Sequence, residues 1–117
     1  MTTVYIINKG VHDHSDAKRF GEIEYLTEGA INRYATSNMY REFTEKLKTS
    51  QPCDYLLPTG LTIMNMIACS IFVLLHGRLN LLIFKTCKKG GAGRYIERRL
   101  VFEKLNNTSS KKCEKEN

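Results

Sequence analysis

The chain has 117 residues, with 18 Lys and Arg against 12 Asp and Glu, which gives a formal net charge of +6. A chain of this length fits one domain and excludes a two-domain enzyme with a separate cofactor domain. Because 42% of the residues are hydrophobic and 9% are aromatic, the chain can build a core, which excludes disorder throughout its length.

Apolar spacing divides the chain into strands and helices separated by turn residues. Short β-branched and aromatic runs predict strands, and an apolar residue at every fourth position from Ile31 to Leu47 predicts a long helix. In chain order, the predicted elements are a strand over 4–7, a helical turn over 17–20, a strand over 22–27, a helix over 30–48, a strand over 54–58, a helix from 61 or 62 to 75, and strands over 79–84 and 95–102.

The order of these elements predicts an α/β fold. Strands that alternate with helices favour a mostly parallel sheet, and the apolar run over 79–84 is typical of a strand covered on both faces. The Gly-rich connection over 88–93 predicts that the last two strands form an antiparallel edge hairpin. We therefore expect a small Rossmann-like domain of two or three layers over residues 1–103, with strand order 2-1-3-4-5, and a disordered polar tail over 104–117.

The apolar stretch over 61–75 predicts a buried helix, because a membrane span needs about 20 residues. Its apolar residues nearly encircle the helix, and one small sheet rarely covers both sides of such a helix. The remaining apolar side needs the first long helix or another subunit, and on the second interpretation we expect a homo-oligomer. The first residues lack the basic segment of a secretory signal, and the four cysteines form no C-x-x-C pair, so we expect a cytoplasmic protein without membrane contact.

A sheet with this strand order predicts a ligand site where the chain reverses direction, between the first and third strands. Both strands lead into Gly turns, at Gly10 and Gly60, where the backbone can approach a ligand closely. The second turn precedes a helix N-terminus, which favours an anion, although an ordinary turn with a Thr cap fits the same residues. The predicted ligand-binding residues are Asn8, Lys9, Gly10, His12, Asp13, Ser15, Asp16, Thr59, Gly60, Thr62 and Asn65.

The loop from His12 to Asp16 is the densest polar cluster in the sequence. Its two His and two Asp, at positions 12, 13, 14 and 16, suit a divalent metal or acid–base chemistry, so a small metal-assisted hydrolase or nucleotide-processing enzyme stays open as an alternative. The other interpretation is a capped loop, in which Ser15 or Asp16 accepts helix N–H groups. Our leading hypothesis is non-enzymatic and has no resident cofactor, and the divalent metal belongs to the enzyme alternative.

Most of the net charge lies in the predicted hairpin. Residues 85–104 contain seven Lys and Arg and two Glu, a net charge of +5 out of the total of +6. Such a surface can follow a phosphate backbone, although edge hairpins also carry basic residues that prevent sheets from pairing. The candidate nucleic-acid-binding residues are Lys88, Lys89, Arg94, Arg98 and Arg99.

Distinctive short motifs are spread along the chain: His12-Asp13, Ser15-Asp16-Ala17, Arg19-Phe20-Gly21, Glu28-Gly29, Met39-Tyr40-Arg41, Gly60-Leu61-Thr62 and the run from His76 to Leu82. With these motifs, residues 4–102 resemble small, mostly uncharacterised proteins of tailed bacteriophages. The resemblance implies a phage origin and a host-cytoplasm setting, and it brings no activity with it.

Together these features predict the binding module of a phage accessory protein. We expect it to hold a nucleotide or another phosphorylated ligand between the Asn8–Asp16 loop and the Thr59–Asn65 turn. In this hypothesis Lys9 neutralises a phosphate, and Thr62 and Asn65 orient it. The alternatives are the metal-assisted enzyme and a structural, oligomeric interaction subunit whose basic hairpin binds nucleic acid.

Overall fold

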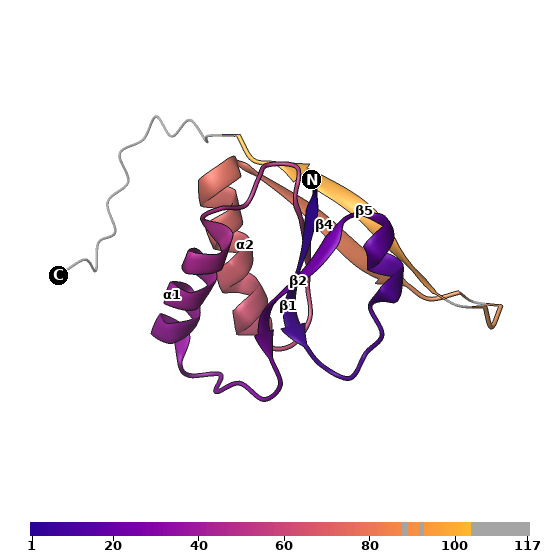
Figure 1. Cartoon of the computed structure of the whole chain (residues 1–117), viewed down its shortest axis with the longest axis horizontal. Coiled ribbons are helices and arrows are strands. Elements are labelled where there is room, and N and C mark those ends of the chain that lie inside the picture. The colour runs from indigo at the N-terminus through magenta and orange to yellow at the C-terminus, as the bar shows by residue number, and fades with distance from the viewer. Residues whose placement is uncertain (88, 92, 104–117) are drawn as a thin grey trace, which may run out of the picture.

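A five-stranded sheet organises the chain in the computed structural model, which describes residues 1–87, 89–91 and 93–103 (Figure 1). Across the sheet, the strands are β2 (Glu22–Glu28), β1 (Thr3–Lys9), β3 (Tyr55–Leu57), β4 (Arg78–Lys85) and β5 (Arg94–Val101). Pairing is parallel from β2 to β4 and antiparallel between β4 and β5, which confirms the predicted strand order and edge hairpin. The tail over 104–117 and Lys88 lie outside the described residues.

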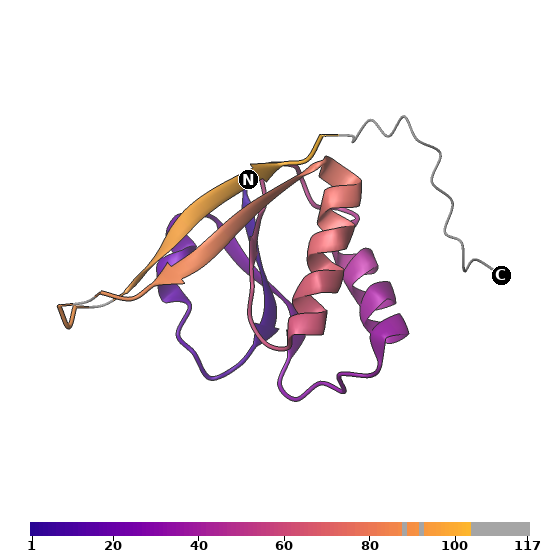
Figure 2. The same cartoon turned by 180° about the vertical axis from the view of Figure 1, so that it is seen from behind.

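Two helices, α1 (Thr36–Leu47) and α2 (Thr62–His76), cover one face of the sheet, and a short 3-10 helix, η1 (Ser15–Arg19), lies against the other (Figures 1 and 2). Side chains of β1 alternate between two cores: Tyr5 and Ile7 enter the core beneath the helices, and Val4 and Ile6 enter the smaller core beside η1. This division explains why β1 is apolar throughout its middle. The fold therefore has two complete layers and a partial third.

The first long helix is shorter than predicted, because it begins at Thr36 instead of Ala30. A local turn replaces the expected first helical turns, since the Asn32 side chain accepts the backbone N–H of Tyr34 at 3.0 Å and competes with helix formation. Ile31 still packs against the core beneath the helices. The helical spacing of apolar residues therefore extends beyond the helix itself.

Helix α2 forms as predicted, and it ends at Gly77, whose φ of 69° is a left-handed conformation that suits glycine. Its inner side packs against α1 and the sheet, whereas Met66 and Leu74 on its outer side are 60% and 83% exposed. Among the helices that the structure describes, none is long and apolar enough to cross a membrane.

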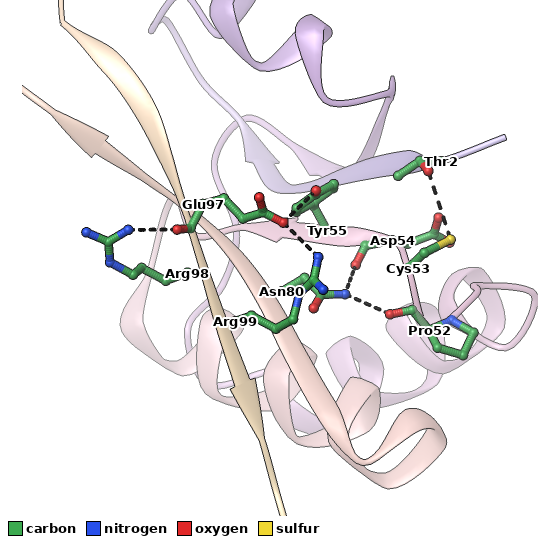
Figure 3. Close-up of polar contacts among 9 residues, drawn as sticks. All are labelled: Thr2, Pro52, Cys53, Asp54, Tyr55, Asn80, Glu97, Arg98 and Arg99. Carbon is green, nitrogen blue, oxygen red and sulfur yellow. Dashed lines mark hydrogen bonds and ion pairs between the residues drawn. The ribbon is translucent and has the colours of Figure 1, made fainter.

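A buried polar contact ties the start of β3 to β4 (Figure 3). Asn80 on β4 is fully buried, and its Nδ2 donates to the carbonyl oxygens of Pro52 and Asp54 at 2.7 and 2.8 Å. The Oδ1 atom of Asn80 has no hydrogen-bond partner among the described residues. Because both acceptors are carbonyls, this position requires a side chain that donates two hydrogen bonds.

Candidate functional site

A cavity of about 450 Å³ opens at the end of the sheet where β3 finishes. Because β3 has only three residues, β4 continues beyond the end of β3. The edge of β4 that would face β3 is therefore uncovered from that point. The walls come from the loop after β1, the β3–α2 turn, the end of β4 and the start of β5. The lining residues are His12, Asp13, His14, Leu57, Pro58, Thr59, Gly60, Leu82, Ile83, Phe84 and Tyr95.

His14 and Tyr95 form a buried hydrogen-bonded pair in the cavity wall. The Nδ1 atom of His14 lies 2.8 Å from the phenol oxygen of Tyr95, and only 8% and 5% of the two residues are exposed. Burial lowers the pKa of His14, and burial together with nearby carboxylates raises the pKa of Tyr95. Both groups are therefore uncharged near neutral pH, so the wall presents a neutral imidazole and a neutral phenol.

Helix η1 holds the start of β5 beside the cavity. Asp16 accepts the backbone N–H of Tyr95 at 2.8 Å, and Arg19 donates to the Tyr95 carbonyl oxygen at 2.6 Å. The predicted cap by Ser15 or Asp16 is not formed, and Asp13 instead accepts the N–H of Ser15 at 2.9 Å. These backbone N–H groups hold the pKa of Asp13 and the pKa of Asp16 below their usual range. Asp16 is thus bound to the sheet.

The polar residues of the β3–α2 turn are hydrogen-bonded within the fold. The hydroxyl of Thr59 accepts the Asn8 N–H and donates to the Asn8 carbonyl, both at 2.8 Å. Asn65 accepts the Thr59 N–H at 3.1 Å and donates to the carbonyls of Thr59 and Leu61. Gly60 has a φ of 77°, and a Cβ there would lie 2.9 Å from the Cβ of Asn8. The turn therefore requires this glycine for its own conformation.

The structure brings only part of the predicted ligand-binding set to the cavity. The predicted residues that line it are His12, Asp13, Thr59 and Gly60. Those that do not line it are Asn8, Lys9, Gly10, Ser15, Asp16, Thr62 and Asn65. The Nζ of Lys9, which was expected at a phosphate, lies 5.1 Å from the ring centre of Tyr25 on β2. The cavity is therefore displaced from the β1–β3 crevice towards β4 and β5.

The lining residues that the sequence reasoning missed are mostly apolar. They are His14, which was considered only for metal or acid–base chemistry, and Leu57, Pro58, Leu82, Ile83, Phe84 and Tyr95. The sequence feature that could have indicated two of them is the predicted hairpin, because its pairing places Phe84 opposite Tyr95. In the structure their ring centres are 5.2 Å apart. An apolar lining with a few polar groups is typical of small-molecule sites.

Of the four residues considered for metal or acid–base chemistry, His12, Asp13 and His14 line the cavity and Asp16 does not. Asp16 contacts β5, and His14 contacts Tyr95, as described above. The third histidine, His76, lies at the other end of α2, where its Nε2 is 2.7 Å from the hydroxyl of Ser50. Within residues 1–87, 89–91 and 93–103, no three His, Cys, Asp or Glu side chains are placed to hold one metal ion.

Among the candidate nucleic-acid-binding residues that the structure describes, the two on the middle of β5 lie on different faces of the hairpin. Arg98 and Arg99 are neighbours on β5 and leave the strand on opposite sides (Figure 3). The guanidinium of Arg99 pairs with Glu97 at 2.9 Å. Lys89 and Arg94 are exposed. These positions do not form one continuous basic face.

A family model described as Phage Pam3 gp32-like protein matches residues 2–100 of the chain. The chain belongs to this family. Its members are phage proteins of unknown function, which confirms the resemblance to bacteriophage proteins. The match includes every residue that lines the cavity. No curated protein and no solved structure matches the chain.

Proposed function

We propose that this phage protein is a binding module that holds a nucleotide or another phosphorylated small molecule in the cavity beside β3. The observation that carries the proposal is the cavity itself, whose volume of about 450 Å³ suits a small molecule. It opens at the carboxyl ends of parallel strands, which is where open α/β sheets bind their ligands.

The wall of the cavity suits a flat heteroaromatic ring. Phe84 meets Tyr95 edge to face and is still 49% exposed, so a ligand ring can stack on it. The neutral pair of His14 and Tyr95 and the exposed His12 supply donors and acceptors for ring substituents. Helix α2 begins just after Gly60 of the wall, so its N-terminus, which favours an anionic group such as a phosphate, lies next to the cavity and outside its lining.

Thermal melting with a ligand panel tests the proposal. The panel contains nucleoside monophosphates of the common bases, the matching nucleosides and inorganic phosphate. A ligand at about 100 times its Kd adds about 2.7 kcal/mol to the free energy of unfolding. For a domain of this size, such a gain raises the Tm by about 10 °C or more.

Two phenylalanines of similar exposure provide a matched pair of variants. Phe84, in the cavity wall, is 49% exposed, and Phe102, outside it, is 46% exposed. We expect Phe84→Ala to lose the ligand-induced shift in Tm and Phe102→Ala to keep it. The proposal is wrong if no nucleotide shifts the Tm of the native protein, or if both variants respond equally.

A further inference from the structure

The outer side of α2 is a row of exposed side chains without charge. None of the 15 residues of this helix is Asp, Glu, Lys or Arg. Figure 2 shows α2 between α1 and the β4–β5 hairpin, with its outer side turned away from the sheet. Met66 and Leu74 remain 60% and 83% exposed there. The exposed row, with one residue at every fourth position, consists of Thr62, Met66, Ser70 and Leu74.

The lack of charge is a property of α2 and not of the helical layer as a whole. Helix α1 also buries an apolar inner side, but its exposed residues carry both signs of charge. A surface helix normally has such residues on its outer side, whereas the centre of a protein–protein interface is depleted of charge and enriched in methionine. The outer side of α2 therefore has the composition of an interface. The exposed charged residues of α1 are Arg41, Glu42, Glu45 and Lys46.

The outer row of α2 is complementary to itself. Ser70 lies one residue from the middle of the helix, and its hydroxyl donates back to the Met66 carbonyl at 2.7 Å. If two copies of α2 cross antiparallel at Ser70, Met66 of each copy meets Leu74 of the other. The two small serines then face each other at the crossing, where the helices come closest. A two-fold interface requires a surface of this kind, which pairs with a second copy of itself.

The distribution of charge favours the antiparallel arrangement. β4 begins directly after Gly77, at the C-terminal end of α2, and leads away from it into the basic hairpin (Figure 2). Residues 85–104 carry a net charge of +5. An antiparallel pair of α2 helices directs the two hairpins in opposite directions. A parallel pair would place both hairpins at the same end, where their like charges repel.

The exposed apolar surface continues past the C-terminal end of the row. The N–H of Phe102 donates to the Gly77 carbonyl at 2.9 Å, and Leu100 lies on the same side of the sheet as α2, opposite the core residue Leu79. Leu75, Leu100 and Phe102 are each nearly half exposed. A helix of this length, about 22 Å, covers only part of the roughly 800 Å² that each partner buries in a standard interface. These three side chains enlarge the contact.

We propose that the outer row of α2 binds the same row of a second copy of this chain, as the centre of an antiparallel two-fold homodimer. The apolar surface at Leu75, Leu100 and Phe102 then covers the N-terminal end of α2 in the other copy. No residue of α2 lines the cavity described above, so this inference is independent of the proposed ligand.

Sedimentation velocity from micromolar to submillimolar concentration tests the dimer. We expect a species of twice the mass of the chain, which persists at high salt because the contact is apolar. Met66→Glu with Leu74→Glu places like charges in the contact and should raise the dimer Kd about 100-fold or more. The control, Tyr34→Glu with Tyr40→Glu, adds the same charge at residues that are 84% and 55% exposed away from α2. We expect the control to keep the native Kd.

Cysteine cross-linking tests the geometry without the added charge. In a background with Cys53, Cys87 and Cys113 replaced by Ser, Ser70→Cys should form a disulfide with the second copy, because a residue on a two-fold axis meets itself. Thr62→Cys is the control, in the same exposed row. It lies eight residues, about 12 Å, from the crossing, so its two copies are too far apart to be bridged.

Each outcome decides the inference. A native protein that stays monomeric at submillimolar concentration overturns it. Equal dimerisation of the native protein and the Met66→Glu, Leu74→Glu variant overturns the assignment to α2, provided that circular dichroism shows the variant to be folded. If that variant does not fold, the cross-linking decides. Equal cross-linking of Ser70→Cys and Thr62→Cys overturns the antiparallel crossing.

Discussion

Replacing the buried Asn80 by Asp should strongly destabilise the fold at neutral pH, because the exchange puts an oxygen where an NH₂ group donates two hydrogen bonds. The carbonyls of Pro52 and Asp54 would lose donors that now lie 2.7 and 2.8 Å away, at a residue with no exposed surface. Asp54 is buried whereas Pro52 is exposed, so only the Asp54 carbonyl is left without a partner away from water, at a cost of about 1–3 kcal/mol. The buried carboxylate adds its own cost, so the loss is a substantial part of the total stability of a small domain, about 5–15 kcal/mol.

The same variant should respond to pH. Burial raises the pKa of the introduced carboxyl above the value of about 3.9 that it has when unfolded. At this carboxyl the folded state then binds more protons than the unfolded state, so the free energy of unfolding of the variant, relative to that of the native protein, rises as the pH falls towards 4. Urea unfolding at pH 7.5 and 4.5 measures this change. The control is Asn38→Asp on α1, where a carboxylate can keep the contact with Arg41. If Asn80→Asp is as stable as the native protein at pH 7.5, the reasoning is refuted.

Three further predictions have defined outcomes. Gly60→Ala should cost about 1–3 kcal/mol because of its left-handed backbone, whereas Gly10→Ala, where a Cβ meets no atom within 4 Å, should leave the Tm unchanged. Tyr95→Phe should cost about 1–3 kcal/mol in urea unfolding, since the buried His14 nitrogen loses its partner, and an unchanged midpoint contradicts this. Burial lowers the pKa of both His14 and His76, so the folded state binds fewer protons and the native protein should lose stability as the pH falls below about 7. His14→Gln should reduce that slope in urea unfolding, and an unchanged slope would show that His14 does not contribute.

The architecture could be predicted because burial and connectivity leave a clear pattern. The alternation of strands and helices requires parallel pairing and crossover connections, and the short connection before β5 requires an antiparallel pair. The start of α1 could not be predicted in the same way. The spacing of Ile31 reflects its burial beneath the helices, and it gives no information on whether the backbone there is helical.

The cavity was harder to predict because it depends on the length of one strand. The sequence pattern predicts a third strand over 54–58, whereas β3 ends at Leu57 and leaves the edge of β4 uncovered from that point. Composition also does not show whether a polar group is free to meet a ligand. Thr59 and Asn65 looked suited to ligand contact, but their polar atoms bind each other and the end of β1.

Helix η1 both shapes the cavity wall and covers the outer edge of β5 at the start of that strand. The backbone N–H and carbonyl of Tyr95 are bound by Asp16 and Arg19, so another strand cannot pair with β5 at this position. The same contacts place the Tyr95 ring against His14 in the cavity wall. The expected homo-oligomer stays a prediction, and extension of the sheet through the start of β5 is an unfavourable way to form it. The outer side of α2, where Leu74 is 83% exposed, is the surface that such a contact would cover.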